Sequence, residues 1–175
     1  NAFRKKIVLI IMAFEPIYKK DSTSSSSLIF GNPESDVAIV TLWSKAKEVA
    51  ARIDSDSFCV LGQLFSAERG LDLLVRNLLA NPQIKKIVVT GIDYSKSGIV
   101  LLDFFKNGFE KGKADVTDKP CWRINSTYPG YIGLDIPEKD LEQLRKSVTA
   151  LRVVKTGGFD FSTIPIPEEL REKRV

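Results

Sequence analysis

The sequence predicts an α/β fold, a Rossmann-like three-layer sandwich with a mostly parallel central sheet and helices on both faces. The main observation is the segment from Phe58 to Gly98, where an apolar strand, a polar loop, an amphipathic helix, a second apolar strand and a second polar loop follow one another. Several short runs consist almost entirely of Ile, Val and Leu, which is typical of parallel strands buried on both faces. Two parallel strands joined by a helix place their following loops at one edge of a sheet, where open α/β sheets bind ligands.

Five short segments have the composition of sheet strands. Each is rich in Ile, Val or Leu and is bounded by polar or turn residues. In chain order, we expect strands at Lys6–Phe14, Asp36–Leu42, Phe58–Gly62, Ile84–Gly91 and Leu151–Val154.

Four segments have the periodicity of helices. Ser44 is the predicted N-cap of the first, Asn81-Pro82 ends the second, Asn107-Gly108 is the predicted C-cap of the third and Pro137 opens the fourth. The third is apolar nearly all round from Ile99 to Lys106, so we expect it to be well buried. The other apolar stripes are formed by residues 46, 49, 50 and 53, by residues 71, 74, 75, 78 and 79, and by residues 141, 144 and 148.

These elements indicate a single α/β domain over residues 1–156. It includes a low-complexity polar loop at 21–27 that we expect to be mobile. Residues 111–119 are charged and irregular, and the aromatic, turn-rich segment 121–133 permits no structural prediction. Residues 157–175 are predicted to form an extended C-terminal arm or linker. The chain starts at Asn1 without Met and stops within a charged run, which indicates a piece of a longer protein.

Composition excludes several classes of protein. The chain has 2 Cys without a CxxC pair and no His, so neither a disulfide scaffold nor a cysteine zinc site is predicted. The longest apolar run, at residues 7–14, is too short to cross a membrane, and the absence of an export segment predicts a cytoplasmic protein. The net charge of +4 comes from residues 1–20 rather than from a basic stripe over a folded face, which disfavours nucleic-acid binding.

The polar loops after Gly62 and after Gly91 form the predicted ligand site. A helix N-terminus offers free N–H groups and a positive dipole end to an anion, and Lys96 is able to neutralise a phosphate or carboxylate. Neither loop matches a dinucleotide-binding or Walker pattern. The alternative, that these residues only cap helices and form turns, stays open. The predicted ligand-binding residues are Gly62, Gln63, Ser66, Arg69, Gly70, Gly91, Asp93, Ser95, Lys96, Ser97 and Gly98.

Other side chains have structural interpretations. We expect Trp43 and Trp122 to be core aromatics, with a place at the rim as the alternative, and Arg76 to be solvated or paired with Asp72 on the same helix. Tyr128 and the tyrosine three residues later flank a Pro-Gly turn, and a lid over the sheet edge and a plain turn explain them equally well.

Three segments carry a resemblance to a known family: VAIVTLWS, VLGQLFSAERGLDLLVRNLLANPQIKKIVVTG and SGIVLLDFFKNG. Together they resemble the domain shared by the A subunit of tetrahydromethanopterin S-methyltransferase and a module joined to archaeal-type thymidylate synthases, and they are closer to the second. The likeness covers roughly residues 36–155. The tail IPIPEELREKRV is similar to the linker that precedes the synthase domain in such fusions.

The resemblance implies an expectation about cofactors. In the methyltransferase family, the lower axial ligand to the cobalt of a corrinoid is a His in the loop that corresponds to Ile92–Gly98. The stretch IDYSKSG contains no His, and the Lys96 ammonium has no lone pair to donate, which disfavours a corrinoid held by a protein ligand. A pterin or folate remains open. Pro120-Cys121-Trp122 lacks the His that follows the synthase Cys, so any synthase chemistry is expected to lie beyond Val175.

The favoured function is that of a non-catalytic or accessory small-molecule-binding domain of a thymidylate synthase-type or methyl-transfer protein. Its expected ligand is an anionic nucleotide or a pterin-like molecule at the carboxyl edge of the sheet. Two alternatives stay open: a structural or homodimerisation module without a ligand, and a methyltransferase-like enzyme component that lacks the corrinoid His. No catalytic residue and no metal ligand is predicted, and the expected partners are a covalently linked synthase domain or a second copy of the chain.

Overall fold

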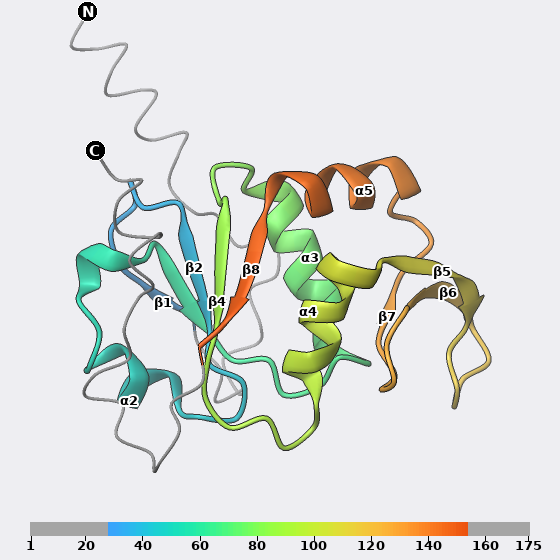
Figure 1. Cartoon of the computed structure of the whole chain (residues 1–175), viewed down its shortest axis with the longest axis horizontal. Helices are drawn as coiled ribbons and strands as arrows, with labels where there is room; N and C mark the ends of the chain where they lie inside the picture. Colours follow the sequence, from blue (N-terminus) through green and yellow to red (C-terminus); the bar gives the residue numbers. More distant parts are fainter. Residues whose placement is uncertain (1–27, 154–175) are drawn as a thin grey trace, which may run out of the picture.

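A computed structural model of the chain describes residues 28–153, which form two sheets and four α-helices (Figure 1). The larger sheet has five strands in the order β1-β3-β2-β4-β8, and the smaller has three in the order β5-β6-β7. The strands are β1 (Ile29–Phe30), β2 (Val37–Val40), β3 (Val60–Gly62), β4 (Lys86–Val89), β5 (Phe109–Lys113), β6 (Pro120–Ile124), β7 (Tyr131–Ile132) and β8 (Thr149–Arg152). The helices are α2 (Ala46–Ala50), α3 (Gly70–Ala80), α4 (Ser97–Asn107) and α5 (Glu138–Ser147), with a 3₁₀ turn η1 (Ser55–Ser57) before β3.

The predicted Rossmann-like three-layer sandwich is wrong. The five-stranded sheet is mixed, because β1 runs antiparallel to β3, and the second sheet is wholly antiparallel. Helices also do not cover the two faces of the large sheet equally: α3, α4 and α5 contribute to one core, whereas the five-residue α2 is the one helix of the described residues that packs on the other face. The strand prediction for Lys6–Phe14, the polar loop at 21–27 and the arm at 157–175 lie outside the described residues.

The smaller sheet is the feature that the sequence did not reveal. Strand β5 ends within the segment 111–119, whose charged sequence predicts irregular structure. Strand β6 begins just before the aromatic, turn-rich segment, and β7 lies within it. Phe109 faces Ile124 and Lys113 faces Pro120 across the β5–β6 pair. Because β5 is an edge strand, its exposed positions are charged, which hides the alternating pattern of a half-buried strand.

Strands β2, β3, β4 and β8 run parallel, as expected for the central segment. Strand β2 lies between β3 and β4, with Ala38 opposite both Val60 and Ile87. All four residues of β2 are buried, because the strand contributes alternate side chains to two cores. Loops that follow β2, β3 and β4 therefore meet at one edge of the sheet.

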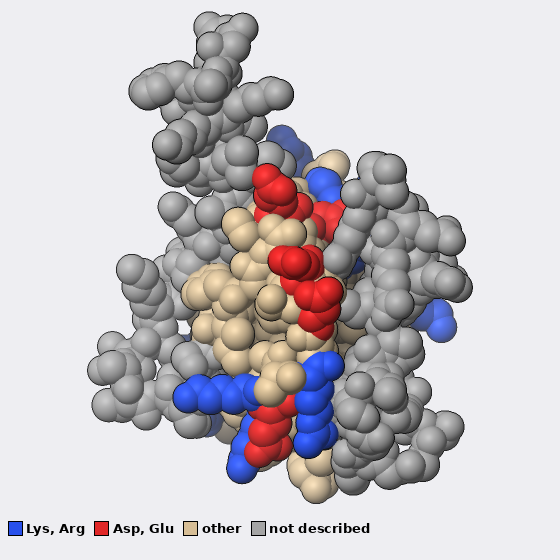
Figure 2. Space-filling model, turned by 90° about the vertical axis from the view of Figure 1, so that its left-hand side faces the viewer, with Lys and Arg blue, Asp and Glu red and all other residues tan. Residues whose placement is uncertain are grey.

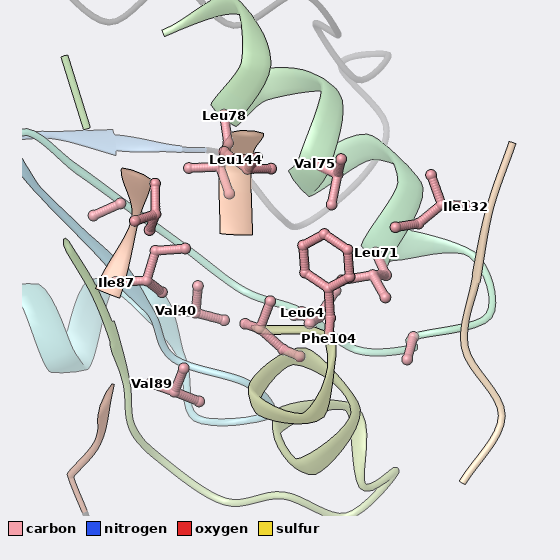
Figure 3. Packing of buried hydrophobic residues seen from close by; sticks show 14 of the residues in the cluster. Val40, Leu64, Leu71, Val75, Leu78, Ile87, Val89, Phe104, Ile132 and Leu144 are labelled. Carbon is pink, nitrogen blue, oxygen red and sulfur yellow. The ribbon is translucent and has the colours of Figure 1, made fainter. Parts of the chain in front are cut away.

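The main core lies between the sheet and α3, α4 and α5 (Figure 3). Leu71, Val75 and Leu78 are the buried residues of α3 and share one face of the helix. Figure 3 shows them directed toward the same interior as Phe104 of α4 and Ile87 of β4. Burying each such side chain contributes about 1.5–3 kcal/mol, so these contacts hold the helices on the sheet.

The helices lie where the sequence predicts them, whereas one predicted cap differs. Helices α3 and α4 occupy the predicted segments, Gly108 is the C-cap of α4, and Pro137 is the N-cap of α5. The N-cap of α2 is Lys45 rather than Ser44, because the Ser44 hydroxyl accepts a hydrogen bond from the Ile92 N–H at 3.0 Å. A long-range contact has thus taken the predicted cap.

The described surface carries charges of both signs. On the side that bears α2 and β1, Asp and Glu side chains extend from the top down one side of an uncharged area, and Lys and Arg gather below it together with another acid (Figure 2). No continuous basic stripe crosses the described part of this face. Among residues 28–153, no helix has the length and apolar content needed to cross a membrane.

Candidate functional site

The candidate site is the carboxyl edge of the large sheet, where residues 41–45, 62–70 and 90–98 follow β2, β3 and β4. Since β2 lies between the other two strands, its loop lies between theirs. The loop from β4 to α4 runs along this edge in Figure 1. Crevices outside the carboxyl ends of strands are the usual ligand sites of open α/β sheets.

Trp43 joins the two loops that the sequence singled out. Its indole N–H donates to the Phe65 carbonyl at 3.2 Å and to the Ser95 hydroxyl at 3.1 Å. The ring contacts Phe65 and Tyr94 edge-on, with centroids 5.2 and 6.0 Å away. Its prediction as a core residue is wrong, because 43% of Trp43 is exposed. Trp122 is buried as expected and donates to the Ile136 carbonyl.

Unusual backbone conformations gather at this edge. Leu42, directly after β2, has φ 54° although it is fully buried, Gly91 has φ 90°, and Lys96 has φ 63°. Left-handed backbone is unfavourable for a bulky residue such as Leu and persists only where surrounding structure enforces it. At Gly91 an added Cβ would overlap the Thr41 carbonyl, so glycine is required there.

The loop after β4 is organised by Asp93. Its two carboxylate oxygens accept hydrogen bonds from the Gly98 N–H at 3.1 Å and the Ile99 N–H at 3.2 Å, at the start of α4. The suggestion that Ser95 or Ser97 caps this helix is therefore wrong. Ser97 is fully buried and donates to the Leu64 carbonyl at 2.7 Å, which ties this loop to the one after β3.

Only the first part of the loop after β3 lies against the rest of the candidate site. Thr41 N–H donates to the Gly62 carbonyl, and the Gln63 amide donates to the Leu42 carbonyl at 3.3 Å, so this part lies against the β2 loop. The Ser66 hydroxyl instead accepts from the Glu68 N–H within its own turn. Arg69 is exposed at the N-cap of α3 and makes no capping hydrogen bond through its side chain, and Gly70 begins the helix.

Arg152, at the end of β8, borders the same edge and was not predicted. One guanidinium nitrogen, Nη2, donates to the Gly91 carbonyl at 2.7 Å. Burial lowers the pKa of Arg152, while the charge of Asp93 acts in the opposite direction. Only the pairing of Val89 with Arg152 brings this side chain to the loop, and no local pattern in the sequence reports that pairing.

A second charged cluster lies away from this edge. Arg76 on α3 donates to Asp72 at 2.8 Å, which confirms the predicted pair, and to Asp135 at 2.7 Å. The hydrogen bonds from Arg76 hold the pKa of Asp135 below its usual value. Asp72 also accepts from the Gly133 N–H, so the cluster ties α3 to the segment after β7 and supports the fold.

Tyr131 lies next to the loop after β3, because its N–H donates to the Ala67 carbonyl at 3.4 Å, and a lid over the sheet edge stays a prediction. It is buried in β7, where its hydroxyl accepts a hydrogen bond from the Asp115 N–H at 3.0 Å. The tyrosine therefore lies within the smaller sheet.

The donor set at the edge does not fit a protein-ligated corrinoid. Residues 92–98 include no imidazole, both oxygens of Asp93 are used by the start of α4, and the Ser97 hydroxyl is committed to Leu64. Among residues 28–153, no group of three or more His, Cys, Asp or Glu side chains could hold a metal ion. The arrangement instead offers an exposed indole, an exposed Tyr94 ring and cationic groups, which suit a planar ring that bears an anionic substituent.

Comparisons with known proteins agree on one family. The family model MtrA, described as the A subunit of tetrahydromethanopterin S-methyltransferase, matches residues 21–167. The chain is 34% identical over 91 residues to the A subunit of tetrahydromethanopterin S-methyltransferase from Methanococcus aeolicus, which is 52% of this chain and 36% of that protein. It is 32% identical over 87 residues to the corresponding A subunit of Methanococcus maripaludis, or 49% of this chain and 36% of that protein.

A third relative comes from Methanobrevibacter ruminantium and is the tetrahydromethanopterin S-methyltransferase A subunit numbered 2 in that organism. Identity there is 26% over 95 residues, which is 53% of this chain and 48% of that protein. The chain therefore covers between 36% and 48% of the length of these three relatives.

Proposed function

Because this chain belongs to the MtrA family, the family of the tetrahydromethanopterin S-methyltransferase A subunit, we propose that it is a small-molecule-binding module of a methyl-transfer system. It holds its ligand at the carboxyl edge of the large sheet, among the loops at residues 41–45, 62–70 and 90–98. Its role is to bind and present the ligand rather than to carry out the chemical step.

The observation that carries this proposal is the placement of Trp43. A large aromatic side chain that is 43% exposed loses the benefit of full burial, yet its N–H is held by groups from two loops. This arrangement presents a preorganised ring at the point where three parallel strands end. A planar ligand stacks on such a ring with little loss of side-chain entropy, because the indole is already fixed.

Charge around the ring favours an anionic ligand. Lys96 and Arg69 are both exposed at this edge, and Lys96 directly precedes α4. The N–H groups of Gly98 and Ile99 at the start of α4 are already bound by Asp93, whereas the N-cap residue of α3, Arg69, makes no side-chain capping hydrogen bond. The ligand class that fits both features is a nucleotide or a pterin-type molecule with a phosphate or carboxylate group.

The proposal includes no step through cobalt, since residues 92–98 include no imidazole and the Lys96 ammonium has no lone pair to donate. A methyl-transfer role without that ligand is one in which the chain holds the methyl donor or acceptor. The relatives are described as subunits, and we propose that this chain likewise works with other chains. A linked or associated thymidylate synthase is a finer proposal, which purification of the native protein with its partners tests.

The test uses calorimetry and tryptophan emission. The full chain is titrated with tetrahydromethanopterin, folate, dUMP and a cobamide, and we expect saturable heat and a change in Trp43 emission for at least one pterin or nucleotide. In the Trp43→Phe variant the remaining tryptophan of the chain is Trp122, which is buried in the core. The emission of this variant should therefore stay constant when ligand is added. Flat heat signals and unchanged emission with every compound would refute the proposed function, and a response that persists in Trp43→Phe would place the site elsewhere.

A further inference from the structure

Arg152 has a buried hydrogen-bond donor without a partner. Its Nη2 donates to the Gly91 carbonyl, but Nη1 is shielded from solvent and makes no hydrogen bond. Within residues 28–153, it is the one buried side-chain nitrogen or oxygen in this condition. Buried polar groups are nearly always paired, and an unpaired one calls for a bound water, ion or ligand.

Three other arginines in the described part of the chain have the carboxylate partner that Arg152 lacks. Arg76, Arg123 and Arg145 each donate to a carboxylate, at distances of 2.8, 2.6 and 2.8 Å. Arg152 forms no ion pair with any residue between 28 and 153. Its positive charge is therefore partly removed from water without a carboxylate in contact.

The nearest acidic influence on Arg152 is Asp93, which opposes the lowering of the Arg152 pKa caused by burial. Both oxygens of Asp93 are already hydrogen-bonded to the N–H groups of Gly98 and Ile99. Asp93 thus acts on Arg152 at a distance and leaves the Nη1 donor unused.

The position of Arg152 places that donor at the candidate site. Ala150 contributes to the core beneath α4 whereas Leu151 contributes to the opposite core, so Arg152 shares the face of Ala150. Its backbone pairs with Val89, two residues before Gly91. The guanidinium therefore lies on the α4 side of the sheet, beside the loop from β4.

We propose that Arg152 is the anchor for an oxyanion, a phosphate or a carboxylate, carried by the ligand that binds at this edge. The inference rests on the proposed function and names the group that determines its preference for anions. A guanidinium presents parallel N–H groups that match two oxygens of such an anion. Because Nη1 is covered in the ligand-free chain, the anion reaches it only when its cover shifts, and binding is therefore accompanied by a local rearrangement.

The experiment measures anion binding to the full chain at constant ionic strength. Inorganic phosphate and acetate are the two probes, and chloride replaces them in the control buffer. We expect at least one of them to raise the melting temperature in a saturable way. Arg152→Met should lower the affinity for that probe at least tenfold. Arg152→Lys keeps the positive charge but loses the paired N–H groups of the guanidinium, so it should lower the affinity by a smaller factor. Arg123→Met, on the smaller sheet, should bind as the parent chain does.

Stability without the probe is measured for the same variant. Arg152→Met removes the unpaired Nη1 donor but also the hydrogen bond from Nη2 to the Gly91 carbonyl, so in the absence of phosphate and acetate it should be less stable than the parent chain, and only the anion dependence of the parent chain tests the anchor. A variant that is less stable while the parent chain shows no anion dependence would indicate a structural arginine bridged to Asp93 by water, which overturns the proposal.

The outcomes separate this inference from the proposed function. If a pterin or nucleotide binds equally to the parent chain and to Arg152→Met, the anchor is refuted and the binding role stands. If phosphate or acetate binds through Arg152 while every pterin and nucleotide gives a flat heat signal and no change in Trp43 emission, the anchor is supported and the proposed function is refuted. An absence of response to every probe refutes both.

Discussion

Gly91→Ala should destabilise this chain more than Gly108→Ala does, although both glycines have positive φ, 90° and 82°. An L-residue with positive φ in a sparsely populated region costs about 1–3 kcal/mol, and Gly108, with ψ −154°, lies in a region that is essentially restricted to glycine. The surroundings differ. A Cβ at Gly91 would overlap the Thr41 carbonyl and lie 2.7 Å from the Ser44 hydroxyl, whereas a Cβ at Gly108 meets the Arg145 guanidinium at 3.2–3.4 Å.

The overlap at Gly91 involves backbone that cannot move freely. The Thr41 carbonyl accepts the Ser44 N–H at 3.0 Å, and the Ser44 hydroxyl accepts the Ile92 N–H. Forcing a methyl group into such a site costs a further amount of about 1–3 kcal/mol. We therefore expect a total loss of about 2–6 kcal/mol for Gly91→Ala and about 1–3 kcal/mol for Gly108→Ala.

Urea unfolding followed by far-ultraviolet circular dichroism at 25 °C measures both losses, provided that the slope with urea is the same as in the parent chain. If Gly91→Ala loses no more free energy of unfolding than Gly108→Ala, the close packing of the β2 and β4 loops is incorrect. Such a result would also remove the geometric basis of the proposed site.

Three further predictions follow from single contacts. Asp93→Ala removes both acceptors at the start of α4 and should lower the free energy of unfolding by about 0.5–2 kcal/mol, while Asp93→Asn keeps one acceptor and should lose less; equal losses in urea would contradict the cap. The pKa of Asp135 is held below its unfolded value by hydrogen bonds from Arg76, so its stabilising contribution is complete above the unfolded pKa, about 3.9, and is lost as pH falls through the folded pKa. The melting temperature of Asp135→Asn should therefore fall less steeply below about pH 5 than that of the parent chain. If both chains lose melting temperature equally below about pH 5, the Arg76–Asp135 pair does not stabilise the fold as inferred. Burial raises the pKa of the Cys59 thiol to about 12, so iodoacetamide at pH 8 should modify it only after urea opens the fold; rapid modification of the native chain would show that Cys59 is accessible.

Prediction from the sequence succeeded where the determining interactions are local. The stripe that includes Leu71, Val75 and Leu78 is a property of one helix, and all three residues are buried on one side of α3. The continuous apolar run of β4 likewise predicts a strand buried on both faces. The antiparallel strand β1 depends instead on β3, a partner about 30 residues away in the chain. The smaller sheet is formed by strands that are neighbours in the chain, and it was missed because the exposed positions of its edge strand β5 are charged.

The candidate site divides in the same way. The loops after β3 and β4 were predicted from their positions behind apolar strands, whereas Trp43 was assigned to the core because it follows an apolar run. Its actual position depends on Phe65 and Ser95, which are distant in sequence. Asp93 could have been identified as a capping residue from its type, because Asp is a preferred cap and it lies just before the predicted third helix.

The sequence by itself determined where helices α3, α4 and α5 and the parallel strands lie, because hydrophobic periodicity and turn residues act over a few neighbouring positions. Tertiary structure alone decided the antiparallel pairing of β1 with β3, the use of Ser44 by Ile92 and the arrival of Arg152 beside Gly91. Each of these joins residues far apart in the chain, and their hydrogen bonds form only when the packed core has brought the backbones together.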